Sequence, residues 1–277
     1  MWFSTNWLVL SILLPLSFQI NLEQAIRLER LSIRYLFFCA LIFYILWAGS
    51  NYLYTSALSF TSASVVTAVF SSAPVFVFIL SYVILKEIFT LLKLLAVILS
   101  ISGVALIAYS QGFHNISFYG VCFATISALL AAVYKVNLKK ALGDTSMSNT
   151  AIYLALVGAI NMFIFWPLII ILYVLGIEDV SQVPWANLVL QSLASFLFNS
   201  FINYGIIYTS PLFISIGTIL GIPLSILTDY VINPAGQVTI LQICGSGCVA
   251  LGFILLILTG TDSEPNSIYQ EYSLEDD

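Results

Sequence analysis

Nine apolar runs, separated by short polar gaps, follow one another along this chain of 277 residues. A helix that crosses the hydrocarbon core of a bilayer needs about 20 mostly apolar residues, and each run is close to that length. The pattern therefore predicts an all-α polytopic membrane protein with nine transmembrane helices. The runs cover residues 3–20, 36–57, 61–85, 91–110, 117–138, 150–175, 185–208, 211–232 and 238–260.

The basic residues support this count of helices. All eight Lys and Arg residues fall in the first, third and fifth gaps or at their edges, and odd-numbered gaps share one side of the membrane. The positive-inside rule assigns that side to the cytoplasm. We therefore expect an integral multi-pass protein with a disordered, acidic, cytoplasmic carboxyl tail over 261–277. The charges leave both the plasma membrane and the Golgi or another endomembrane open.

Composition excludes several classes of protein. Hydrophobic residues make up 61% of the chain and charged residues 8%, whereas soluble domains carry roughly a quarter charged residues. The one histidine, His114, stands alone in a gap, and the four cysteines lie inside apolar runs. No Ser/His/Asp, paired-carboxylate or metal-spaced cluster exists. We expect no enzyme, cofactor, metal or nucleic acid, and the lipid bilayer as a partner.

An internal repeat divides the chain. Thr61–Ala108 resembles Thr209–Ile257, and two pairs of residues in these segments match at an offset of 149 residues. This predicts a first half over 1–114 with four helices and a second half over 115–260 with five. An odd number of helices per unit inserts the two copies with opposite topology, as in secondary transporters. The repeat also predicts one more helix before residue 1. Matched pairs are Pro74 with Pro223, Gly103 with Gly252, and, at an offset of 152, Asn51 with Asn203.

A family resemblance follows from these segments. Residues 83–108 resemble the end of an EamA-type unit, in which a helix ends at a Glu (Glu87) and an apolar helix with a late Gly (Gly103) follows. Two such units build the drug/metabolite transporter superfamily. Within it the chain resembles solute carrier family 35, subfamily F, and there the members described as thiamine transporters. The stretches that carry this likeness are 2–7, 51–54, 132–136, 198–199, 203–205, 208–211 and 214–218.

The resemblance implies ten helices, with residues 2–7 in the second of them. The chain thus lacks the first helix of the family pattern, in agreement with the repeat. A short isoform, a mis-assigned start and a genuine nine-helix protein all remain open.

Two prolines mark the first candidate site. Pro74 and Pro223 each remove a backbone hydrogen bond from the interior of a predicted helix. Interrupted helices at matching positions of two halves indicate a substrate site near the membrane midplane. The alternative is a packing kink whose backbone groups are satisfied by neighbouring Ser or Thr. Small polar residues accompany the prolines: Thr67 and Ser71 in the first half, and Ser215 and Thr218 in the second.

Amides mark a second candidate surface. Gln191, Ser195, Asn199 and Asn203 follow one another at a spacing of four on one helix, and a lipid-facing amide would leave polar atoms unpaired. We expect this face to line the substrate path together with Asn51, the repeat partner of Asn203. Hydrogen bonds that hold the bundle together are the alternative. Nearby rings that could stack on a heteroaromatic cation include those of Tyr54 and Tyr204.

Two charged residues lie close to membrane depth. Lys135 and Asp229 are candidates for substrate binding or proton coupling, because a charge inside a membrane is costly. Snorkelling of their side chains to a nearby interface is the alternative. Small residues at Cys244, Cys248 and Gly252 instead predict a face for close helix packing.

The patterns and the resemblance together favour a secondary transporter of a small organic solute, such as thiamine or a nucleotide-derived metabolite, working by alternating access. The alternative is a non-transporting, truncated membrane protein that regulates or pairs with a full-length transporter. A homodimer is compatible with both hypotheses.

Overall fold

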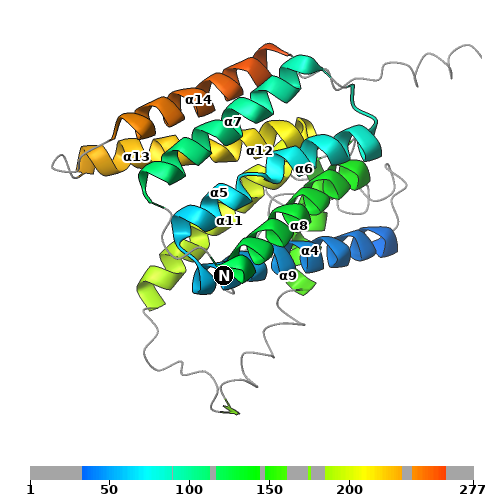
Figure 1. Cartoon of the computed structure of the whole chain (residues 1–277). Coiled ribbons are helices and arrows are strands. Elements are labelled where there is room, and N and C mark those ends of the chain that lie inside the picture. The colour runs from blue at the N-terminus through cyan, green and yellow to red at the C-terminus, as the bar shows by residue number, and fades with distance from the viewer. Residues whose placement is uncertain are drawn as a thin grey trace, which may run out of the picture.

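The fold was analysed in a computed structural model, which describes residues 33–88, 90–112, 117–143, 147–160, 174–175, 185–232 and 239–259. These residues are helical and contain no strand. The predicted helix at 3–20 and the predicted tail at 261–277 lie outside them. The elements, labelled in Figure 1, are α4 (Ile33–Phe60), α5 (Ala63–Phe70), α6 (Ala73–Leu80), the π-helical turn η2 (Ser81–Leu85), α7 (Leu91–Ser110), α8 (Phe118–Leu142), α9 (Met147–Ile160), α11 (Trp185–Tyr208), α12 (Pro211–Ile219), α13 (Gly221–Ile232) and α14 (Ile240–Leu258).

The polytopic, all-helical class is confirmed. Six segments of the described part are long and apolar enough to cross a bilayer: Arg34–Phe60, Ala63–Leu85, Leu91–Ser110, Phe118–Leu142, Pro211–Thr228 and Ile240–Leu258. The helices α7 and α11 begin and end at the residues predicted from the apolar runs. The count of nine helices stays a prediction.

Two of the predicted helices are each divided. The regular helical hydrogen bonding is interrupted at Ser71 and Ser72, between α5 and α6, and at Leu220, between α12 and α13, while the dihedral angles of these residues stay right-handed helical. Pro74 is consequently the second residue of α6 and Pro223 the third residue of α13. At the start of a helical segment the missing N–H of proline costs little. The predicted interruptions are therefore present, and each pair of segments still forms one apolar span, Ala63–Leu85 and Pro211–Thr228. The breaks at Ser71 and Leu220 are themselves 149 residues apart.

Antiparallel packing of α4 on α8 forms the larger part of the core (Figure 1). Two buried serines set the register. The Ser50 hydroxyl donates to the Ser127 carbonyl at 2.9 Å, and the Ser127 hydroxyl donates to the Ser50 carbonyl at 2.6 Å. Such hydrogen bonds between helices hold a bundle together where lipid provides no hydrophobic driving force.

The helices α7 and α14 form a second antiparallel pair, with close contact at glycines. Gly103 faces Gly245, and Gly252 faces Ser100, so neither backbone is kept apart by a side chain. Small residues at an interface allow this approach. The predicted face on α14 is confirmed at Gly252, which is buried, but not at Cys244, which is exposed. The neighbouring residues Gly245 and Val249 are buried instead.

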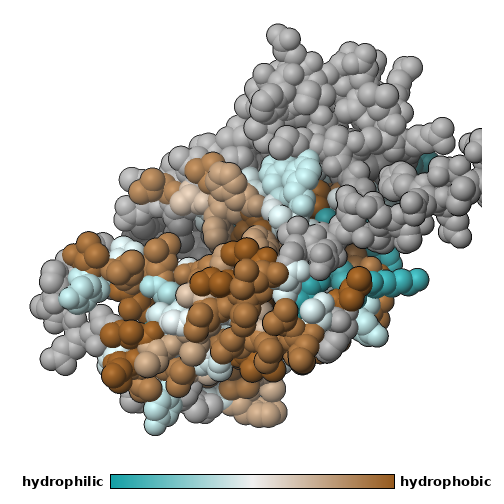
Figure 2. All heavy atoms as spheres, turned by 90° about the horizontal axis from the view of Figure 1, so that it is seen from above, coloured by the Kyte–Doolittle hydropathy of each residue, from teal (hydrophilic) through white to brown (hydrophobic). Residues whose placement is uncertain are grey.

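The outside of the bundle is apolar. Figure 2 shows hydrophobic residues over most of the described surface on the face seen from above. Large side chains exposed on α7 and α14 include Leu91, Leu95, Ile98, Ile243, Leu251 and Ile254. This surface is suited to lipid and not to water.

The basic residues of the described part gather at one end of the bundle. Glu87 follows the left-handed residue Lys86 (φ 56°) and forms an ion pair with Lys93 at 4.0 Å. The ammonium of Lys139, from the end of α8, acts on the same carboxylate and donates to the Ile207 carbonyl of α11 at 2.5 Å. This end therefore joins the two predicted halves through charges.

The close contact between Gly245 and Gly103 leads to a prediction about thermal stability. A Cβ at Gly245 would lie 2.6 Å from the carbonyl oxygen of Gly103, whereas one at Gly247 would meet nothing within 4 Å. Overpacking costs about 1–3 kcal/mol, so Gly245→Ala should lower the thermal midpoint of the purified protein by several degrees. Gly247→Ala is the matched control and should leave it unchanged or slightly higher. Equal shifts in both variants would contradict the close contact.

The buried carboxyl of Glu87 leads to a prediction about how thermal stability depends on pH. Burial raises the pKa of the Glu87 carboxyl above its usual value, and Lys93 and Lys139 lower it in part. A raised pKa in the folded state stabilises the fold at low pH, and this contribution is lost as pH rises through the folded-state pKa. Thermal melts from pH 8 to pH 5 should thus show the natural protein gaining stability relative to Glu87→Gln. A relative loss on acidification would show that the ion pair outweighs burial.

Candidate functional site

A cavity of about 340 Å³ lies between the two interrupted helices and α7. Thr67 of α5 and Thr218 of α12, predicted as candidates from opposite halves, both line it. Ala63, Ser64 and Gln111, which also line it, belong to the start of α5 and the end of α7. The cavity therefore lies toward the end of the bundle opposite to the basic residues. Its remaining lining comes from Val104, Ile107, Ala108, Gly221, Ile222 and Ser225.

Hydroxyl and amide groups supply the polar atoms of this cavity. The Ser64 hydroxyl donates to the Gln111 side-chain oxygen at 3.0 Å, and the hydroxyls of Tyr54 and Thr67 lie 3.4 Å apart. Ser64 and Gln111 were not predicted, since they are 47 residues apart in the chain and only packing of α5 against α7 brings them together. The Thr218 hydroxyl donates to the Ser215 carbonyl at 2.8 Å.

The helix break beside the cavity has its own polar group. Ser71 is buried, and its hydroxyl donates to the Ala68 carbonyl at 2.6 Å. Pro74 follows as a buried residue of α6. This agrees with the alternative in which a neighbouring hydroxyl satisfies backbone groups at the interruption.

The predicted amides behave in two ways. Asn51 and Asn199 are half-buried, and each donates from its side chain to the carbonyl four residues earlier, Trp47 and Ser195, at 2.8 Å. Asn203 is buried, and its side-chain oxygen has no hydrogen-bond partner among the described residues. Of the three asparagines, only Asn203 has a side-chain oxygen that is both buried and unpaired among the described residues.

The two aromatic candidates, Tyr54 and Tyr204, lie on different helices and have different partners. The ring of Tyr204 stacks on that of Tyr208, with centroids 6.5 Å apart and an angle of 4° between planes. Tyr54 is on the other half, beside Thr67. The structure therefore does not bring the two predicted tyrosines into contact with each other.

Of the two charged candidates, Lys135 reaches another helix. Its side chain is 6% exposed, and its ammonium donates to the Ser215 hydroxyl of α12 at 3.1 Å. The ammonium therefore points into the bundle, which disagrees with the snorkelling alternative. Asp229 lies on α13, and its side chain is outside the described residues, as is that of Gln191 on α11.

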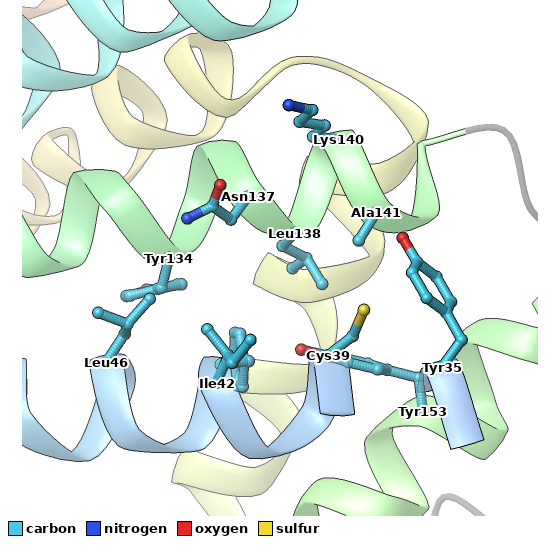
Figure 3. A pocket seen from close by; sticks show the side chains of 11 residues that line it. Tyr35, Cys39, Ile42, Leu46, Tyr134, Asn137, Leu138, Lys140, Ala141 and Tyr153 are labelled. Carbon is cyan, nitrogen blue, oxygen red and sulfur yellow. The ribbon is translucent and has the colours of Figure 1, made fainter. Parts of the chain in front are cut away.

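A second pocket, of about 330 Å³, lies between α4, α8 and α9 (Figure 3). Its walls are mainly apolar and aromatic, and in Figure 3 the polar side chains of Asn137 and Lys140 point away from α4. None of the predicted site residues lines it. The cavity at Thr67 and Thr218 is thus the better candidate for a solute site.

The cavity is equipped for binding by hydrogen bonds. Its polar atoms are neutral hydroxyl and amide groups, which can donate and accept hydrogen bonds. In the part of the chain that the structure describes, no three His, Cys, Asp or Glu side chains lie close enough to hold a metal ion.

Known proteins resemble the chain in sequence and in fold. The EamA-like transporter family matches residues 1–109. Solute carrier family 35 member F3 of Mus musculus is 30% identical over 281 residues, which cover 93% of this chain and 65% of that protein. Member F4 of the same species is 31% identical over 93% of this chain and 56% of its own length. The chain thus spans less than two thirds of these two relatives.

A further relative is covered more completely. An uncharacterized transporter of Schizosaccharomyces pombe is 30% identical over 82% of this chain and 70% of its own length. A crystal structure of another protein superposes with a TM-score of 0.69 over 93% of this chain and 87% of that one, at 15% identity. At that identity the superposition supports the fold alone. The chain therefore belongs to one family with the Schizosaccharomyces pombe transporter. It is similar to EamA-like transporters over residues 1–109 and to members F3 and F4 of solute carrier family 35.

Proposed function

We propose that this protein is a secondary transporter that moves a small organic solute across a membrane by alternating access. Thiamine and nucleotide-derived metabolites are the solute classes to test first. The observation that carries the proposal is the cavity shared by Thr67 and Thr218. Each comes from an interrupted helix, and the two helices occupy matching positions in the predicted halves.

The packing of the two halves supports this proposal. Helices α7 and α14 match in the repeat and pack antiparallel, as two inverted copies would. The cavity takes residues from α5 and α7 on one side and from α12 and α13 on the other. Rocking of one half against the other would therefore open and close it.

The two ends of the bundle differ in a way that suits alternating access. At the basic end, Lys139 of the second half lies close enough to Glu87 of the first half to act on its carboxylate, while the cavity lies toward the other end. We place the basic end and the carboxyl tail in the cytoplasm by the positive-inside rule. The cavity then faces away from the cytoplasm, and opening toward the cytoplasm would separate Lys139 from Glu87. Coupling to protons through Asp229 remains part of the proposal.

Uptake into proteoliposomes tests the transport function. The purified full chain should accumulate at least one of thiamine, nucleosides or nucleotide sugars above protein-free vesicles. Absence of uptake and of counterflow for every such solute would favour the alternative of a non-transporting membrane protein that pairs with a full-length transporter.

Two hydroxyl deletions test the site. Thr67→Val and Thr218→Val should each raise the solute concentration for half-maximal uptake roughly fivefold, since a hydrogen bond contributes about 1 kcal/mol. Thr228→Val is the control, because the Thr228 hydroxyl also donates to a carbonyl of its own helix, Leu224 at 2.8 Å, but is exposed. A similar loss in the control, or none in either cavity variant, would remove the cavity from the transport path.

A further inference from the structure

Lys135 is buried in the bundle, and no residue that the structure describes gives it a counter-charge. It lies seven residues before the end of α8, or about 10 Å at the rise of an α-helix. Its recorded partner is the neutral hydroxyl of Ser215, which itself donates to the Pro211 carbonyl at 2.7 Å. Around it pack the fully buried side chains of Ala132, Val136, Leu212 and Ile216.

No described carboxylate can neutralise this ammonium. Glu87 forms its ion pair with Lys93, at the basic end. Asp229 is fourteen residues beyond Ser215 along α12 and α13, a separation of about 21 Å at the rise of a helix. Lys139, one turn further along α8, reaches the Ile207 carbonyl, and Lys140 is exposed. Lys135 therefore differs from its two neighbouring lysines in being enclosed.

A second unpaired polar group lies at the same depth. Gly205 of α11 contacts Ile214 of α12 across the turn at 209–210. On α8 and α11, Lys139 reaches the Ile207 carbonyl, and Lys135 and Asn203 each lie four residues before these two contacting residues. Asn203 is 3% exposed, and its side-chain oxygen is unpaired among the described residues. The amide can rotate to present its NH₂ group as a hydrogen-bond donor.

Burying an ammonium without an opposite charge costs several kcal/mol, and a cation beside it would add repulsion. An anionic group on the solute would offset that cost through a charge-assisted hydrogen bond. We propose that Lys135, with Ser215 and Asn203, binds the negatively charged group of an organic anion, either a carboxylate or a phosphate. This inference rests on the proposed transport function and assigns the charge of its substrate. It disfavours thiamine, which is a cation, as the substrate.

Matched pairs of solutes test the charge. The purified full chain would be heated with nicotinate or nicotinamide, with uridine monophosphate or uridine, and with thiamine. At least one anion should raise the thermal midpoint at a concentration tenfold or more below that of its neutral partner. A response to uridine monophosphate alone assigns a phosphate, and a response to nicotinate alone assigns a carboxylate. This preference is measured on the unaltered protein and depends on no variant.

Lys135→Met then tests the residue, with Lys140→Met on the same helix as the matched control. Lys135→Met should lose the response to the anion yet keep or raise the midpoint without solute, because it removes a buried charge. A residue with only a structural role would not combine these effects. Lys140→Met should retain both properties of the natural protein.

The outcomes separate the two proposals. If nicotinamide, uridine or thiamine acts as well as or better than the anions, the charge assignment is overturned while the transport function stands. An anion response that survives in Lys135→Met would exclude this residue from the site. If no organic solute stabilises the protein or enters proteoliposomes, the transport function fails, and the assignment of the anion fails with it.

Discussion

The backbone of this protein has to satisfy its own hydrogen bonds, because the hydrocarbon of a bilayer offers no partner for an N–H or C=O group. Long helices such as α7 and α8 meet this demand within one segment. The interruption at Ser71 is tolerated because the Ser71 hydroxyl donates to the Ala68 carbonyl. The interruption at Leu220 is tolerated because the Leu220 N–H donates to the Gly217 carbonyl and the Leu220 carbonyl accepts from the Leu224 N–H. The same constraint that makes the chain helical thus also concentrates its irregular backbone at the candidate site.

The helices also have to be held together within the membrane. Lipid is as apolar as the side chains, so close contact and hydrogen bonds have to hold the bundle together. Hydrogen bonds between Ser50 and Ser127 join α4 to α8, and close contact of Gly103 with Gly245 joins α7 to α14. Both interfaces join antiparallel helices. At the basic end, Glu87 and Lys139 come from different predicted halves, so a change in accessibility would separate these two residues.

The candidate site was only partly predictable, for reasons that differ between residues. Thr67 and Thr218 were found because both stand near a proline at matching repeat positions. Ser64 and Gln111 carried no such signal, since their pairing depends on how α5 meets α7. Asn199 lies one turn before Asn203, and Asn51 occupies the matching position of the repeat. The side chains of Asn51 and Asn199 nevertheless donate to a carbonyl of their own helix, because a helix has a backbone carbonyl one turn away.

The sequence by itself determined the membrane class, the bounds of α7 and α11 and the family, because apolar length and local motifs are properties of single segments. Only tertiary structure decided the rest. It placed Gly245 and not Cys244 against α7, because the rotation of a helix is set by its neighbour. It made Pro74 a helix start, and it turned Lys135 toward Ser215 and away from water. Which atoms meet across a bundle depends on the crossing of several helices, and no single segment encodes that crossing.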